Sequence, residues 1–324
     1  MTGTLATRKP LTGYHLKLIA LITMFIDHIT VVLVPSGTVY LVLRGIGRIS
    51  FPIYVFLIAE GCRYTSDRFK YAMRLGLFAL ISEIPYDMAL YPKILEQTGW
   101  GWNFVGRTNV FYTLFFAVAL IHVYEVLRRS WKAGLALIAG ELCYTAGSGM
   151  FLEFLEHQGV IDWPLRRILL NILRFTFIPV LLLVCHILEK RLGEKKPMKI
   201  SAAVAVLALL LPLLVAPALE GSYGMFGILV VCLVYLAKTR KWQCIFLALG
   251  MLYHYAWPQV LAASRGSEIN MVSAVLWPVL ALLSAVLIYF AYNGQRGKKA
   301  KWGFYAAYPA HLAILAAIRA LLKV

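Results

Sequence analysis

The apolar stretch LKLIALITMFIDHITVVLV, residues 16–34, decides the fold class of this chain. Its length is close to the roughly 20 residues that an α-helix needs to cross the hydrocarbon core of a bilayer. It lacks the alternation of apolar and polar residues that marks a strand of a membrane barrel. It is too long for the apolar core of a signal peptide and carries Asp27 and His28 in its interior, so we expect a retained first membrane helix.

Stretches of the same kind recur along the whole chain. Of the 324 residues, 61% are apolar and only 15% are charged, whereas about 25% of the residues in soluble domains are charged. Only helices and closed barrels satisfy their backbone hydrogen bonds inside a bilayer. The sequence therefore predicts an all-α, polytopic membrane bundle that forms a single domain over residues 1–324. We expect about eleven transmembrane helices, near residues 16–34, 39–61, 71–91, 109–127, 133–150, 167–188, 200–217, 222–237, 242–262, 270–292 and 303–322.

The lysines and arginines indicate which side of the membrane each loop faces. With the N-terminus in the cytoplasm, 22 of the 32 basic residues fall in inner segments, 7 in outer segments and three within helices. Basic residues favour the cytoplasmic side, so we predict a cytoplasmic N-terminus and a multi-pass location in the inner (cytoplasmic) membrane. The net charge of +17 is spread loop by loop. We therefore expect the lipid bilayer, and no nucleic acid, as a partner.

The cysteines and two of the histidines form no recognisable disulfide or metal motif. The five cysteines all lie in apolar stretches and contain no C-x-x-C pair, which argues against a disulfide framework and a zinc site. His122 and His186 fall near the predicted inner ends of their helices. At such a position we expect a hydrogen-bonded or interfacial histidine rather than a catalytic one. We therefore predict no bound metal.

Ionisable side chains inside the predicted spans are the strongest signal of function, because a charge in the bilayer is costly unless it is paired or faces water. Asp27 lies about 16 Å along the first helix, slightly beyond the midplane. His28 follows it, and neighbouring helix residues point about 100° apart, so the two side chains cannot face one partner. Arg44 and Arg48 are spaced i,i+4 and share one face of the second helix.

A pair of carboxylates repeats this spacing in the third predicted helix. Glu83 and Asp87 are four residues apart, and Pro85 between them removes a backbone hydrogen bond and is expected to kink the helix. The arginines and these carboxylates lie at similar depth, so we expect at least one salt bridge between the two helices. Further polar groups at comparable depth indicate one intramembrane polar site; they are Asn109, Tyr223, His254 and His311.

Several of these residues fall in motifs that resemble the TraX family. The motifs follow the family's order, include unusual charged residues and cover the first four predicted helices and the last one; they are LKLIA (16–20), MFIDHI (24–29), GRISFPI (47–53), AEG (59–61), LFALISEIPYD (77–87), NVFYT (109–113) and FYAAYPAHL (304–312). The chain departs from the pattern at Ser222, where the family usually has Asp in an Asp-Tyr-Gly motif, and Glu220 lies two residues earlier. Residues 139–218 look like a family-variable expansion.

The resemblance implies membrane acyl transfer. The namesake of the TraX family is associated with N-terminal acetylation of conjugative pilin, and the family looks like a branch of the membrane acyltransferases that modify surface polysaccharides with acetyl-CoA. The resemblance therefore implies an acetyltransferase that takes its acyl donor, acetyl-CoA, from the cytoplasm. The implied acceptor is an amine or hydroxyl of pilin or of a cell-envelope glycan. Composition by itself indicates only a membrane protein with an intramembrane polar site.

Such a reaction needs a general base, a group that orients the base, and donors for the developing oxyanion. We predict His28 as the base and His311 as the second candidate, because histidine titrates near neutral pH. The orienting carboxylate is Asp27, Glu83 or Asp87. A histidine that itself carries the acetyl group is an open alternative. Arg48 and Asn109 are the expected donors to the acyl oxygen, and the full set of expected substrate-binding residues is Arg44, Arg48, Asn109, Tyr223 and His254.

Two other classes of protein fit the same residues. A proton-coupled secondary transporter also uses intramembrane acids and histidines, although the chain lacks the internal repeat that many transporters have. A structural subunit of an envelope complex would use the charges only to join helices.

Overall fold

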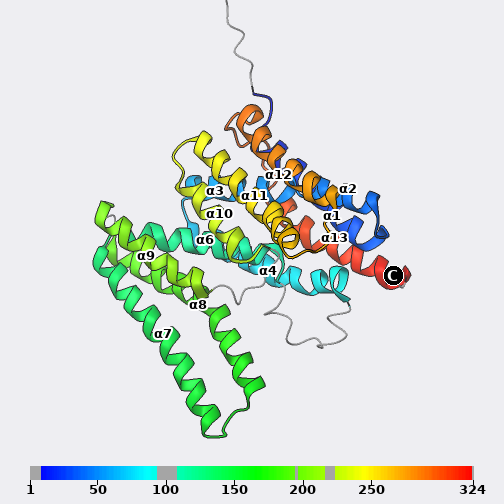
Figure 1. Ribbon diagram of the computed structural model, residues 1–324. Coiled ribbons are helices and arrows are strands. Elements are labelled where there is room, and N and C mark those ends of the chain that lie inside the picture. The colour runs from blue at the N-terminus through cyan, green and yellow to red at the C-terminus, as the bar shows by residue number, and fades with distance from the viewer. Residues whose placement is uncertain (1–8, 93–107, 194–195, 216–222, 323–324) are drawn as a thin grey trace, which may run out of the picture. The chain divides into compact units, whose positions relative to one another are not determined.

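Twelve α-helices make up the part of the chain that the computed structural model describes, which is residues 9–92, 108–193, 196–215 and 223–322 (Figure 1). They are α1 (Gly13–Leu33), α2 (Thr38–Gly47), α3 (Ser50–Tyr64), α4 (Arg68–Leu90), α6 (Val110–Leu127), α7 (Trp131–His157), α8 (Trp163–Leu192), α9 (Lys199–Val215), α10 (Gly224–Leu236), α11 (Arg240–Ser264), α12 (Met271–Ala291) and α13 (Lys301–Leu322). Within the same residues, extended backbone pairs only at an isolated bridge between Leu11 and Tyr292. The prediction of an all-α protein is confirmed.

Each of the eleven predicted spans coincides with a helix or, for residues 39–61, with the pair α2 and α3. By length and composition, eight candidate spans among the described residues can cross a membrane, with α2 and α3 counted as one. α4 is not among the eight, and α9 and α10 are apolar but shorter. The chain is thus a multi-pass membrane protein, whereas the count of eleven and the cytoplasmic N-terminus stay predictions.

The second predicted span is broken at Arg48, between α2 and α3. The backbone N–H groups of Arg48 and Ile49 bond to the carbonyls three residues back, at Gly45 and Ile46, in a tighter turn than that of an α-helix. Pro52 has no N–H to donate to the carbonyl of Arg48, so the α-helical ladder cannot run through this point. The break places the Arg48 side chain at the junction of two helices.

The helices fall into two compact units. The first comprises Met1–Arg63, Leu80–Gln97 and Leu233–Val324, and the second comprises Tyr64–Ala79 and Thr98–Cys232. The first half of α4 therefore belongs to the second unit and its later half to the first. The single domain over residues 1–324 and the expansion at residues 139–218 both stay predictions.

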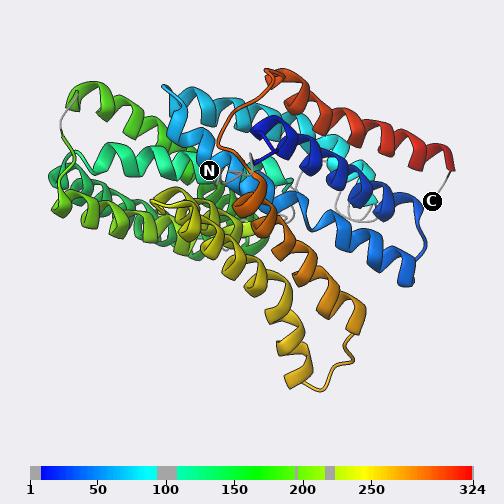
Figure 2. The same ribbon diagram turned by 90° about the horizontal axis from the view of Figure 1, so that it is seen from above.

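In the first unit, α1 packs against α2 and α13, while α12 packs against α2 and α11. Figure 2 shows α11 and α12 as a long antiparallel hairpin. α1 begins with a capping box, in which the Thr12 hydroxyl accepts from the backbone of His15 and the His15 ring accepts from the backbone of Thr12. The fully buried Leu16 and Ala20 lie on the inner face of the same helix. This packing fixes the helix that carries Asp27 and His28.

In the second unit, α6 packs against α8 and α9, and α7 packs against the same two helices. α6 is apolar on all sides and most of its side chains are buried, which is the pattern of a central helix. α7 and α8 lie side by side (Figure 1) and expose large apolar side chains such as Leu142, Phe151 and Leu183. Exposed apolar surface of this kind suits a lipid environment.

Candidate functional site

Two histidines that are 283 residues apart in the sequence meet inside the first unit. His28 comes from α1 and His311 from α13, and a hydrogen bond of 2.7 Å joins Nδ1 of His28 to Nε2 of His311. Their rings are nearly parallel, with centroids 5.0 Å apart. His311 is buried and His28 is half-buried. Both residues are candidate bases by sequence, and the structure brings them into direct contact.

The hydrogen bonds of His311 fix the direction in which the pair donates when both rings are neutral. Nδ1 of His311 lies 2.9 Å from the carbonyl oxygen of Ala307, and a carbonyl can only accept, so Nδ1 carries the proton. Nε2 of His311 is then an acceptor, and Nδ1 of His28 donates to it. Neutral His28 therefore has its second nitrogen, Nε2, unprotonated. This nitrogen has the lone pair that a general base needs.

Aromatic rings surround the two histidines. The ring centroid of Phe25 lies 4.5 Å from that of His311. Tyr308 presents its edge to both imidazoles, with centroid distances of 6.0 Å to His28 and 5.5 Å to His311. Packing of this kind holds the imidazole planes in one orientation.

Asp27 points toward α2, away from the partner of His28. Its Oδ2 accepts a hydrogen bond of 2.6 Å from Nη1 of Arg44, and its Oδ1 lies 3.4 Å from Nη2 of Arg48. The expectation that Asp27 and His28 have different partners is therefore confirmed. Gly47 permits this close approach, because a Cβ at position 47 would overlap the Asp27 side chain.

The Arg48 guanidinium lies over two aromatic rings. It is 4.6 Å from the ring centroid of Trp277 and 5.6 Å from that of Tyr255, distances at which cation–π attraction is significant. The half-buried His254 precedes Tyr255 on α11, with ring centroids 4.7 Å apart. His254 therefore belongs to the helix that contacts Arg48. Sequence reasoning missed Trp277 and Tyr255, since contacts between helices far apart in sequence leave no local pattern.

The two predicted carboxylates of α4 lie in the half of that helix that belongs to the first unit. Glu83 is almost fully buried. α4 is tied to α13, the helix of His311, because Arg319 donates a hydrogen bond of 2.8 Å to the carbonyl oxygen of Ala89. The salt bridge expected between Arg44 or Arg48 and Glu83 or Asp87 stays a prediction; the arginine contacts described above go to Asp27.

Two further predicted site residues belong to the second unit. Asn109 caps α6 and is fully buried, and its side chain donates a hydrogen bond of 2.8 Å to the carbonyl oxygen of Ala79. Tyr223 immediately precedes α10 and is half-buried. Their assignment to substrate binding stays a prediction. Ser222 and Glu220 lie outside the described residues.

The arrangement in the first unit is chemically competent for proton transfer and for stabilising negative charge. It combines the unprotonated Nε2 of His28, a second imidazole that accepts a hydrogen bond from Nδ1–H of His28, and two guanidinium groups beside the same turn of α1. Guanidinium groups supply fixed N–H donors for developing anionic oxygens.

Comparisons with known proteins identify the family of the chain. The family model described as TraX protein matches residues 12–155 and 159–319. A probable fimbrial assembly protein, FimC of Dichelobacter nodosus, is 30% identical over 111 residues, which cover 34% of this chain and 44% of that protein. No solved structure matches the chain significantly. Because the family model covers nearly the whole sequence and includes both histidines of the pair, the chain belongs to the TraX family.

Proposed function

We propose that this protein is an integral membrane acetyltransferase that moves an acetyl group from acetyl-CoA to an amine or hydroxyl acceptor. The observation that carries the proposal is the hydrogen bond of 2.7 Å between His28 and His311, two histidines from opposite ends of the chain. Ionisable side chains such as these imidazoles are energetically unfavourable inside a membrane, so their presence there indicates a function. In acyl transfer, His28 would be the general base and His311 the group that orients it.

In the proposed reaction, Nε2 of His28 takes the proton from the acceptor as the acceptor's nitrogen or oxygen attacks the thioester carbonyl. The charge that then develops on the His28 ring is stabilised by the donation of its Nδ1–H to His311. Collapse of the tetrahedral intermediate breaks the carbon–sulfur bond, and the departing thiolate recovers the proton from His28. His311 has the positioning role that a carboxylate has in serine hydrolases, where the oriented imidazole is worth several orders of magnitude in rate.

In this proposal, the cluster of Asp27, Arg44 and Arg48 stabilises the negative charge that develops on the acyl oxygen. Asp27 holds both guanidinium groups beside the turn of α1 that carries His28. We assign Arg48 as a donor to the acyl oxygen, because its position at the break between α2 and α3 and over Trp277 fixes its orientation. Arg44 holds Asp27. One donor to an oxyanion is worth about 3–4 kcal/mol of barrier.

The remaining predicted residues have supporting roles in this proposal. Glu83 and Asp87 line the acceptor side from α4, and His254 contributes to substrate binding from the helix that contacts Arg48. Asn109 and Tyr223 belong to the second unit and stay predicted substrate-binding residues, with Asn109 as the further donor expected for the acyl oxygen. These assignments rest on the family motifs and on depth along the helices.

A pilin or fimbrial subunit is the acceptor that we favour. The relative from Dichelobacter nodosus is named a probable fimbrial assembly protein, and the resemblance of the motifs implies acetylation of a pilin N-terminus. A cell-envelope glycan is the alternative acceptor. The proposal also includes eleven spans with a cytoplasmic N-terminus in the inner membrane, supported by the 22 basic residues on the inner side.

The second candidate function is proton-coupled transport, because a chain of two hydrogen-bonded imidazoles is also a proton relay. The two functions differ in products. An acetyltransferase releases free CoA thiol in proportion to acetylated acceptor, whereas a transporter reconstituted in liposomes moves protons without releasing thiol.

The experiment that tests the proposal incubates membranes containing the protein with radiolabelled acetyl-CoA and separates protein, glycan and lipid fractions. We expect label in a single fraction, dependent on the protein, with an equal amount of CoA thiol released. Membranes with the His28→Ala variant at the same level of folded protein are the control. Absence of any label transfer, together with proton flux in liposomes, would assign the chain to the transporters.

A further inference from the structure

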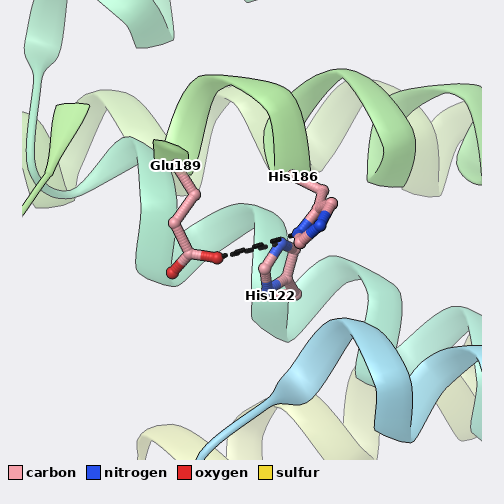
Figure 3. Close-up of side chains that lie close together, drawn as sticks. All are labelled: His122, His186 and Glu189. Atoms are coloured by element: carbon pink, nitrogen blue, oxygen red, sulfur yellow. Dashed lines mark ion pairs between the residues drawn. The ribbon is translucent and has the colours of Figure 1, made fainter. Parts of the chain in front are cut away.

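Three ligand-type side chains meet in the second unit, and none of them is assigned to acetyl transfer above. They are His122 on α6 and His186 and Glu189 on α8 (Figure 3). The ligating atoms of the three all lie within 4.8 Å of one another. Oε2 of Glu189 lies 3.9 Å from Nε2 of His122 and 4.0 Å from Nδ1 of His186. Both ring nitrogens thus face the same carboxylate oxygen.

The two histidine nitrogens that face this oxygen lack hydrogen-bond partners in the described structure. Nε2 of His122 and Nδ1 of His186 are both buried and unbonded, and the His122 side chain is only 3% exposed. A buried polar atom without a partner costs about 1–3 kcal/mol. A bound cation is one of the partners that such an atom can have in a native structure.

We propose that His122, His186 and Glu189 bind a divalent d-block cation of the zinc class, with water completing the coordination. His186 and Glu189 are spaced i,i+3 and therefore lie on one face of α8, as in the metal sites of helical bundles. Two histidines and one carboxylate are a ligand set that zinc takes with an open fourth position. The cation would tie α6 to α8.

The distances fit this assignment after a small closure. Metal–ligand bonds of about 2.0–2.1 Å place two ligand atoms of a tetrahedral site about 3.3 Å apart. The contacts of 3.9 and 4.0 Å must then shorten by about 0.6–0.7 Å. Rotation of the Glu189 carboxylate would shorten both contacts. The ring of His186 stacks on Phe69 with centroids 3.9 Å apart, which holds the imidazole plane.

The surroundings position the carboxylate. Oε1 of Glu189 lies 3.2 Å from Nη2 of Arg129, which leaves Oε2 directed at the two histidines. Outer contacts of this kind orient metal ligands. Asp67 adds negative charge nearby. Burial raises the pKa of its carboxyl, but the hydrogen bonds from Lys70 and the proximity of His186 outweigh burial, so the pKa lies below its ordinary value. Arg68 contributes an opposing positive charge near His122.

The sequence alone predicts no metal, because the two histidines come from helices separated by more than sixty residues and form no short motif. The proposal therefore departs from that prediction on the strength of the observed geometry. It is independent of the acetyltransferase proposal, which uses none of these three side chains and whose histidine pair lies in the first unit.

The test is a Co²⁺ titration of the full-length, tag-free protein in detergent after removal of metals with a chelator. We expect a saturable visible absorption of the intense, four-coordinate type at about one Co²⁺ per chain, which Zn²⁺ displaces. We also expect Zn²⁺ to raise the melting temperature of the protein. A wild-type titration that shows only the weak spectrum of hydrated Co²⁺ overturns the proposal, whatever the variants do.

The variants locate the site. His122→Ala, His186→Ala and Glu189→Gln should each remove the saturable absorption. Arg129→Gln should weaken binding about 10–100-fold without changing the spectrum, as loss of an outer contact does. His157→Ala is the matched control, since it removes an exposed histidine of the same unit and should bind Co²⁺ like wild type. Saturable absorption that survives in all three ligand variants would place the cation elsewhere and overturn the proposal.

Discussion

Replacement of Gly47 by Ala is the sharpest structural test of the Asp27 cluster. A Cβ on residue 47 would overlap Oδ1, Cβ and Cγ of Asp27, and no other neighbour is as close. Because the Cβ of Asp27 is among the overlapped atoms, rotation of the side chain cannot relieve the clash. α1 and α2 must instead separate at this point, by about 1 Å, to restore ordinary van der Waals contact.

Two effects set the size of the loss. Overpacking of a close helix–helix contact costs about 1–3 kcal/mol. The same separation stretches the hydrogen bond of 2.6 Å from Arg44 to Asp27 beyond useful range, and a hydrogen bond to a charged group is worth about 1.5–3 kcal/mol. We therefore expect Gly47→Ala to lower the free energy of unfolding by about 3 kcal/mol or more.

The assay is thermal unfolding in detergent, with two other glycines as controls. A Cβ on Gly45 would meet only side-chain atoms of α12 residues, 3.1–3.3 Å away, so Gly45→Ala should cost much less. Gly140 lies on α7 with nothing within 4 Å of the added atom. Gly140→Ala should be neutral or stabilising, by up to about 1 kcal/mol from helix propensity. A Gly47→Ala protein as stable as wild type, or a larger loss at Gly45, would refute the packing described here.

Three further predictions concern pairing, capping and topology. Asp27→Asn should cost about 3–5 kcal/mol, and adding Arg44→Gln should restore part of this loss; strictly additive losses would show that the pair is not coupled. Arg63 donates to three carbonyl oxygens at the C-terminal end of α10. Arg63→Ala should therefore lower the melting temperature. Arg63→Lys should not restore it, because the lysine ammonium lacks the planar set of N–H donors of a guanidinium. With the native cysteines replaced, a single cysteine in the segment 190–199 should resist an impermeant thiol reagent in intact cells. A single cysteine at Gly99, outside the described residues, should react. Labelling in 190–199 would show that the membrane orientation is the reverse of the predicted one.

Sequence reasoning predicts the helices well because their length and apolarity are local properties. All eleven predicted spans coincide with helices, since a stretch of apolar residues has no other stable form in a bilayer. The divergent directions of Asp27 and His28 are also predictable, because they follow from the 100° step of the helix. The break at Arg48 was missed, although Pro52 four residues later was the signal for it.

Which helices pack against each other could not be predicted from the sequence. Nothing local indicates that His28 meets His311, because the contact depends on how α1 packs against α13. For the same reason, the sequence does not indicate the ion pair of Arg48 with Asp27 on α1. The grouping of His122 with His186 and Glu189 likewise arises only when α6 packs against α8.

The most direct test of the central claim is acetyl transfer by the His28→Ala protein. The measurement compares label transferred from acetyl-CoA to the identified acceptor, per amount of folded protein, for wild type, His28→Ala, His311→Ala and the His157→Ala control. Because removal of a general base costs about 100-fold or more, we expect His28→Ala to lose nearly all turnover, His311→Ala to lose most of it, and the control to match wild type, with similar melting temperatures throughout. Full turnover in both His28→Ala and His311→Ala would contradict the account and direct attention to a carboxylate base such as Asp87.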